Sequence, residues 1–134
     1  MTRFVRFNIV GLLGFGVQLA VLVSLQRAGW PVLLAAVVAV EAAVLHNFVW
    51  HERWTWAGVR VGSCAGRLAR FHAVNGLISL SGNAIITVAL ADAGVSVALA
   101  NICAVVACAA ANYMAAHLLV FCATTWPSFD GHLH

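Results

Sequence analysis

The chain has 134 residues, of which 63% are apolar and only 8% are charged, and its mean hydropathy is +0.98. A water-soluble domain of this size would leave much of that apolar surface exposed, so the composition excludes an ordinary soluble protein. The formal net charge of +3 comes with no basic, aromatic-interleaved surface, so no nucleic-acid partner is expected. We expect an all-α integral membrane protein, because backbone groups in lipid must be satisfied internally and no two-residue alternation indicates a barrel.

Four apolar runs, taken in chain order, predict four transmembrane helices at residues 7–25, 32–50, 71–90 and 97–121. About 20 residues at about 1.5 Å each span a hydrocarbon core about 30 Å thick. Gly29 and Pro31 separate the first two runs, and Gly94 separates the last two, with Ser96 as the expected N-cap of the fourth. The connection at 51–70 is polar and is expected to lie outside the hydrocarbon.

The arginines predict the orientation of these helices, since the chain has no lysine. One side of the membrane would hold Arg27 alone. The other side, with the N-terminus and the middle connection, would hold Arg3, Arg6, Arg53, Arg60, Arg67 and Arg70. The positive-inside rule then places both termini in the cytoplasm. The four cysteines contain no Cys-x-x-Cys pair, so we expect reduced thiols and no zinc site.

The second half of the sequence resembles the first, which predicts an internal duplication. Residues 3–56 align with 67–121 at an offset of 64, which becomes 65 after one inserted residue, Asn75. The aligned pairs include Arg6 with Arg70, Gly14 with Ser79, Gln18 with Asn83, Asn47 with Asn112, and Trp56 with Phe121. Each half holds two helices, so the prediction is one transmembrane domain over residues 1–134, built as two parallel helical-hairpin repeats with a loop at 57–66 and a tail at 122–134.

Small side chains recur at every fourth residue in the second and fourth runs, and each series ends in an asparagine. The two series are Ala35, Ala39, Ala43 and Asn47, and Ala100, Ala104, Cys108 and Asn112. Such stripes allow helices to approach closely in lipid, where association depends on packing and hydrogen bonds. We expect them to hold the bundle or its oligomer together.

Polar residues at membrane depth leave two interpretations open. Gln18 and Asn83 lie on faces that also carry other small or polar residues, and either bond neighbouring helices or line a groove for a head group. Glu41 has Val106 as its repeat mate, so the duplication does not explain it. A charge there costs about 2.5 to 3.5 kcal/mol, which favours a functional role over a tolerated neutral acid.

Two stretches resemble the GtrA-like family of small four-helix membrane proteins. The clearer one is Asn47-Phe48-Val49-Trp50-His51-Glu52-Arg53-Trp54-Thr55-Trp56, and Arg6-Phe7 through Gly11 matches the family's opening. The resemblance covers about residues 3–121. Two features depart from the family pattern: the basic residue expected after Asn112 is missing, and Gln18 replaces an acidic residue.

The resemblance implies translocation of a polyprenyl-phosphate-linked sugar across the bacterial cytoplasmic (inner) membrane, for cell-envelope polysaccharide or glycolipid synthesis. Such a ligand needs cationic donors for the phosphate, and planar guanidinium groups bind phosphate oxygens in a bidentate manner. The arginines alternatively reflect topology and contacts with ordinary membrane lipids. Trp50, Trp54 and Trp56 are interpreted as an interfacial belt in preference to a platform that stacks on a sugar. The candidate substrate-binding residues are Arg6, Arg53, Arg70, Gln18, Glu41, Asn47, Asn83 and Asn112.

Other functions compete with this hypothesis. An enzyme is the least supported class, because no catalytic triad, phosphate loop or His-Glu-x-x-His motif is present, and we expect no cofactor or metal. One alternative is a proton-coupled exporter resembling the small multidrug transporters, although their membrane acid lies in the first helix. Another is a scaffold that recruits a membrane glycosyltransferase. A homo-oligomer is expected for any transport role, because four helices enclose little volume.

Overall fold

The structure is a computed structural model that describes residues 1–122, apart from the side chains of residues 97 and 98. The predicted tail falls outside these residues from 123 onward. Every regular element within residues 1–122 is helical, and four of the described helices are long and apolar enough to cross a membrane: Arg3–Arg27, Val32–Thr55, Cys64–Asp92 and Leu99–Phe121. The all-α, four-helix prediction is confirmed, and the chain is a multi-pass membrane protein.

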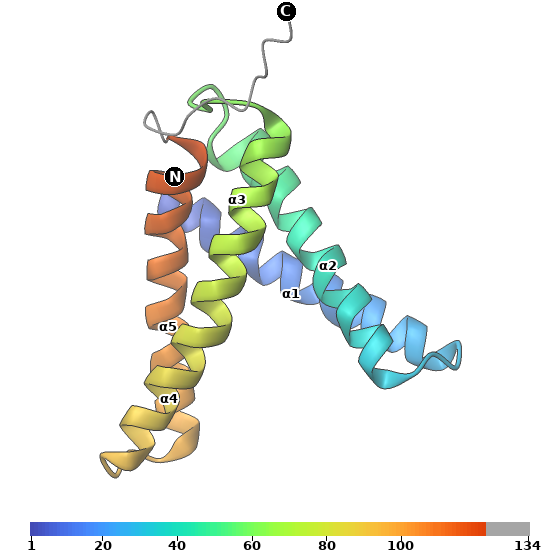
Figure 1. Cartoon of the computed structure of the whole chain (residues 1–134), viewed down its shortest axis with the longest axis vertical. Coiled ribbons are helices and arrows are strands. Elements are labelled where there is room, and N and C mark those ends of the chain that lie inside the picture. The colour runs from blue at the N-terminus through green and yellow to red at the C-terminus, as the bar shows by residue number, and fades with distance from the viewer. Residues whose placement is uncertain (123–134) are drawn as a thin grey trace, which may run out of the picture. The chain divides into compact units, whose positions relative to one another are not determined.

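The chain divides into two compact units, Met1–Gly58 and a second that begins at Val59. The first unit is a helical hairpin in which α1 (Arg3–Arg27) lies beside α2 (Val32–Trp50) (Figure 1). The π-helical turn η1 (His51–Thr55) continues α2 without a break. The hydroxyl of Thr2 caps α1 by accepting a hydrogen bond from the amide of Val5 at 3.4 Å.

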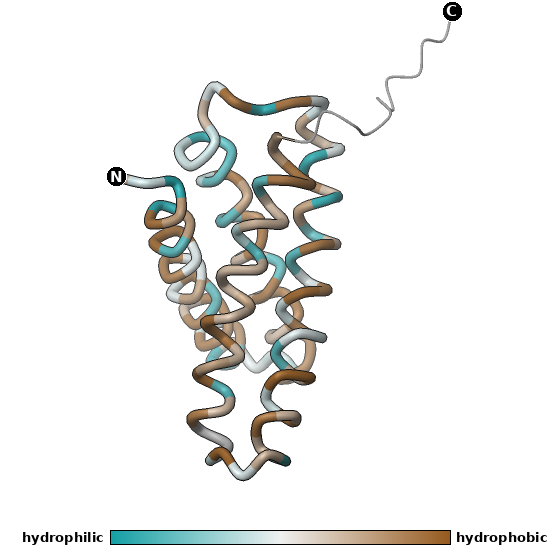
Figure 2. The backbone as a smooth tube through the Cα atoms, turned by 90° about the vertical axis from the view of Figure 1, so that its left-hand side faces the viewer, coloured by the Kyte–Doolittle hydropathy of each residue, from teal (hydrophilic) through white to brown (hydrophobic). Residues whose placement is uncertain are grey.

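The second unit is also a helical hairpin. Its first arm runs through α3 (Cys64–Leu77), the π turn η2 (Ile78–Gly82) and α4 (Asn83–Asp92). Its second arm is α5 (Val97–Ala115) followed by the π turn η3 (Ala116–Phe121). Apolar residues recur along the whole length of each hairpin (Figure 2), as expected of helices that face lipid.

Both hairpins turn through the same glycine-dependent motif. Gly29 and Gly94 have φ angles of 83° and 90°, which favour glycine because it lacks a Cβ. Around Gly94, the amide of Val95 donates to the carbonyl of Leu90, and Gly94 itself donates to Ala91. Equivalent bonds close the turn at Gly29, so each first arm ends in a Schellman motif. Ser96 occupies the N-cap position of α5, as predicted, although its side chain makes no capping hydrogen bond.

The small-residue stripes form the seams of the hairpins. Ala35 and Ala39 are fully buried, as are Ala100 and Ala104, and Ala43 and Cys108 are 6% exposed. Because α2 packs on α1 and α5 packs on the arm that contains α4, the stripes hold each hairpin together internally. Their predicted role in packing is confirmed at the level of the hairpin.

The predicted polar connection at 51–70 is helical at both ends, and its non-helical part lies at residues 56–63, where a loop was predicted at 57–66. The second helix continues to Thr55, and α3 already begins at Cys64, so only about eight residues lie outside helices. The polar side chains of His51, Glu52 and Thr55 are buried instead of solvated. His51 Nδ1 lies 3.0 Å from Thr55 Oγ1, and this local bond satisfies polar groups that a loop would have exposed to water.

Candidate functional site

Arg6 and Arg70, two of the predicted phosphate-binding residues, each bond to the last turn of a helix in their own hairpin. Arg6 Nη1 donates to the carbonyl oxygen of Trp54 at 3.2 Å, and Arg70 Nη2 donates to that of Val120 at 3.3 Å. Carbonyls at a helix C-terminus lack intrahelical partners and carry partial negative charge, so a guanidinium stabilises them. Both arginines are therefore structural in part, which the sequence did not indicate.

Arg6 also fixes the indole of Trp54. Its guanidinium carbon lies 5.5 Å from the centroid of that ring, a cation–π arrangement. The Nε atom of Arg6 is buried and has no hydrogen-bond partner among residues 1–122. Leaving such a buried donor unsatisfied costs free energy.

A buried aromatic cluster supports this end of the first hairpin. The ring of Phe7 stacks on His51 with centroids 4.6 Å apart, and its centroid lies 5.9 Å from that of Trp56 in an edge-on arrangement. Trp56 is fully buried. Its assignment to an interfacial belt is therefore wrong, because the ring packs inside the hairpin where no lipid interface reaches it.

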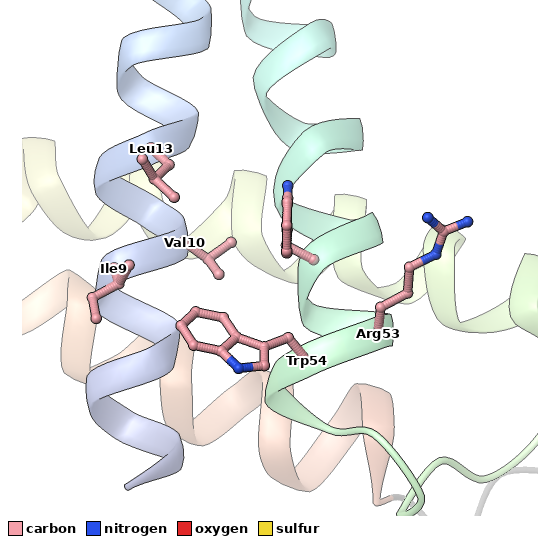
Figure 3. A pocket seen from close by; sticks show the side chains of 6 residues that line it. Ile9, Val10, Leu13, Arg53 and Trp54 are labelled. Carbon is pink, nitrogen blue, oxygen red and sulfur yellow. The ribbon is translucent and has the colours of Figure 1, made fainter. Parts of the chain in front are cut away.

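A pocket of about 420 Å³ lies beside this cluster, between α1 and the end of α2. Ile9, Val10 and Leu13 line it from α1, and Trp50, Arg53 and Trp54 line it from α2 and η1. Figure 3 shows the α1 side chains and Trp54 on one side, while the guanidinium of Arg53 extends away from α1. The lining is thus almost entirely apolar with one cationic group at its edge.

Arg53 differs from the two capping arginines. Its side chain is exposed, and it has no hydrogen-bond partner among the described residues. The five N–H donors of a guanidinium suit a phosphate, and a long aliphatic stem lets the head group move along the rim. Of the three predicted arginines, Arg53 is therefore the one that lines a pocket with its donors available.

The predicted amide residues in the first hairpin do not form one groove. Asn47 packs its amide against Gly14, and its Oδ1 atom lies 3.3 Å from His46 Nδ1. Gln18 is half-buried. The Asn47 prediction as a substrate ligand is not supported by this placement, because its amide fills the space beside a buried glycine and belongs to the helix seam.

Asn83 and Asn112 bond within the second hairpin. Asn112 Nδ2 donates to Ser79 Oγ at 2.8 Å, and Asn83 Oδ1 accepts from Asn101 Nδ2 at 3.1 Å. Interhelical amide bonds are the simpler of the two interpretations that the sequence left open. Oδ1 of Asn112 is buried without a partner among the described residues, so part of its hydrogen-bonding capacity is unused.

Glu41 lies near the middle of the span Val32–Thr55 and is exposed on the surface of its hairpin. It does not line the pocket of Arg53. Of the predicted site residues, only Arg53 lines the pocket, and Arg6 contacts one of its lining residues, Trp54. The others are absent from its lining: Arg70, Gln18, Glu41, Asn47, Asn83 and Asn112. Trp50 and Trp54, which were interpreted from the sequence as part of a belt, line the pocket. Their four-residue spacing places them on one face of the helix, and this spacing could have indicated from sequence that they act together.

Four membrane-spanning helices folded as two hairpins, with arginines bonded to helix ends, define a small multi-pass membrane domain. A family model described as the GtrA/DPMS transmembrane domain matches residues 6–121, which is most of the chain. The chain belongs to this family, and the resemblance inferred from its motifs is confirmed.

One characterised relative gives a further comparison. The chain is similar to a dolichol-phosphate mannosyltransferase of Pyrococcus furiosus, with 36% identity over 107 residues. The match covers 78% of this chain and 29% of the relative. The chain therefore spans less than a third of the length of that protein.

Proposed function

We propose that this protein binds a polyprenyl-phosphate-linked sugar at the first hairpin and moves it across the bacterial cytoplasmic membrane. The observation that carries the proposal is the pocket between α1 and the end of α2, an apolar surface whose lining includes Arg53, with the exposed guanidinium of that residue at its edge. A lipid phosphate has the same two parts, a hydrocarbon chain and an anionic head.

The comparisons support the class of ligand. The relative is named a dolichol-phosphate mannosyltransferase, a name that joins a phosphorylated polyprenyl lipid to a sugar. We propose that the chain handles such a lipid without catalysing sugar transfer. Both termini are proposed to be cytoplasmic, which places Arg6 and Arg53 at the leaflet where the ligand would enter.

A translocation pathway needs more than one small bundle can enclose. Two hairpins with alanine seams leave little room between their own helices, because those seams are fully packed. We therefore propose a homo-oligomer in which neighbouring copies complete the path for the sugar.

Reconstitution in vesicles tests the function. The protein is incorporated into liposomes with a fluorescent glycosyl polyprenyl phosphate, and a membrane-impermeant quencher reports transfer between leaflets. Loss of a charge-assisted bond worth about 1.5–3 kcal/mol predicts that Arg53→Gln slows transfer by about tenfold or more. Arg27→Gln is the matched control, because Arg27 is also exposed but lies at the opposite end of α1. No transfer above protein-free vesicles, or equal loss in both variants, would contradict the proposal.

A scaffold role is the second candidate, and the partial match to a larger transferase favours it. In that case the chain would bind a separate membrane glycosyltransferase and hold it near the lipid substrate. Co-reconstitution with a glycosyltransferase from the same cell separates the two functions. A scaffold raises sugar transfer onto the lipid while the vesicle assay above shows no movement between leaflets.

A further inference from the structure

Three aromatic side chains form a column along one face of α2 and η1. His46, Trp50 and Trp54 are spaced four residues apart, so they lie one above another on the helix. The ring centroids of His46 and Trp50 are 6.2 Å apart, and those of Trp50 and Trp54 are 6.5 Å apart with the planes at 76°. We call these three residues the aromatic column.

The column does not have the form of an interfacial belt. A belt gathers aromatic rings at one depth, whereas eight residues of helix carry this column through about 12 Å. The second hairpin lacks it, since Ala111 and Ala115 stand at the positions aligned with His46 and Trp50.

Trp50 is the exposed member of the column, since His46 and Trp54 are both half-buried. The guanidinium of Arg6 lies over Trp54, and the two indoles meet edge-on. Trp50 is 46% exposed and lines the same pocket as Arg53. A π face carries partial negative charge, and the C–H groups on one face of a sugar ring are complementary to it.

Trp50 and Arg53 are also separated by a suitable distance along the helix. Three residues rise by about 4.5 Å, which is close to the separation of a sugar ring from the phosphate that carries it. A guanidinium on the phosphate would thus leave the attached sugar beside the indole, with the hydrocarbon chain against Ile9, Val10 and Leu13. Charge and shape both match a glycosylated lipid phosphate.

We infer that Trp50 determines specificity for the glycosylated lipid: it stacks on the sugar, so the first hairpin distinguishes a glycosyl polyprenyl phosphate from the same lipid without its sugar. The inference rests on the proposed function, because it names a ligand contact within that pocket. An aromatic stacking contact predicts a preference of about fivefold to tenfold in Kd for the glycosylated lipid.

Binding measurements on the full chain in lipid nanodiscs test the inference. The probes are a glycosyl polyprenyl phosphate, the same polyprenyl phosphate without sugar, and phosphatidylglycerol as an ordinary anionic lipid. We expect Trp50→Leu to abolish the preference for the sugar while keeping the affinity for bare polyprenyl phosphate. Trp50→Phe keeps a ring and should retain part of the preference. Trp30→Leu is the matched control, because Trp30 is also 46% exposed but lies at the opposite end of the helices.

The outcomes separate the inference from the function on which it rests. A preference that survives in Trp50→Leu, or equal affinity of the natural chain for the two polyprenyl lipids, overturns the role of Trp50 and leaves lipid-phosphate binding intact. The proposed function itself fails if the polyprenyl lipids bind no more tightly than phosphatidylglycerol and Arg53→Gln changes none of the three affinities.

Discussion

Gly14 faces the amide of Asn47 across the seam of the first hairpin, and Gly14→Ala tests how closely the two helices depend on that contact. An added Cβ would lie 2.0 Å from Oδ1 of Asn47, 2.6 Å from Cγ and 2.7 Å from Nδ2. All three separations are far shorter than the roughly 3.5 Å at which such atoms attract each other. The whole amide must therefore rotate away, or α1 must separate from α2.

The expected change in the free energy of unfolding for Gly14→Ala is the sum of two unfavourable contributions and one favourable contribution. Overpacking costs about 1–3 kcal/mol, and displacing the amide also breaks its 3.3 Å contact with His46, a bond of a kind worth about 0.6 kcal/mol in membranes. Replacing a helical glycine by alanine returns about 1 kcal/mol of helix propensity. We expect a net loss of about 1–2 kcal/mol in the free energy of unfolding. Gly11→Ala has no atom within 4 Å of the new Cβ and should be neutral or stabilising.

Unfolding in mixed micelles at increasing SDS fraction, followed by far-ultraviolet circular dichroism, measures this difference. The double variant Gly14→Ala with Asn47→Ala should recover part of the loss, because the smaller side chain makes room for the new Cβ. The reasoning is refuted if Gly14→Ala and Gly11→Ala unfold at the same SDS fraction, or if truncating Asn47 gives no recovery in the double variant.

Three further predictions test other parts of the chain. Ser79→Ala should lower the free energy of unfolding by about 0.6 kcal/mol through loss of its 2.8 Å bond to Asn112, as measured by the same SDS titration. Cys64 should react with an impermeant maleimide only from the cytoplasmic side, and labelling from outside intact cells would contradict the predicted orientation. Glu41→Gln should keep the fold and slow sugar translocation in vesicles, and equal rates with identical pH profiles would remove Glu41 from the mechanism.

Much of the fold was predictable because it depends on short-range chemistry. Helix length follows from the thickness of the bilayer, and the turn at Gly29 follows from the one residue type that adopts a positive φ without strain. The four-residue spacing of Ala35, Ala39 and Ala43 predicted a packed face that the structure confirms. The predicted repeat is reflected in matching turns and seams within each hairpin, while the parallel arrangement of the two remains a prediction.

The sequence was less informative about the ends of the helices. The segment after Trp50 is rich in polar and charged residues and was expected to form a polar connection outside the hydrocarbon, whereas a π turn there buries His51 and Glu52. A π turn also accommodates an extra residue, and η3 has six residues where η1 has five. Because of this extra residue, the two halves align differently by two criteria. Trp56 and Phe121 are both fully buried, as the sequence alignment pairs them. The amide that closes each π turn, however, belongs to Trp56 in the first hairpin and to Cys122 in the second.

The candidate site was only partly predictable, because the roles of the arginines depend on tertiary contacts. Arg6 and Arg53 both lie near one end of the first hairpin, and both carry a guanidinium that could donate to a phosphate. Only the packed structure shows that Arg6 bonds to a carbonyl 48 residues away, whereas Arg53 lines the pocket without a partner in the described chain. The amides of Asn47 and Asn112 were likewise ambiguous until their neighbours, Gly14 and Ser79, were in place.

The two hairpins share the arginines that bond to helix ends, but they differ at the positions that line the pocket of the first hairpin. Arg6 and Arg70 bond to equivalent carbonyls, those of Trp54 and Val120. At these positions the first hairpin carries an indole that lines a pocket, and the second carries a buried valine. Packing constrains the shared residues in both hairpins. On the proposed function, each copy in a homo-oligomer would contribute one phosphate site, at the first hairpin, and a second hairpin whose amides bond its own helices.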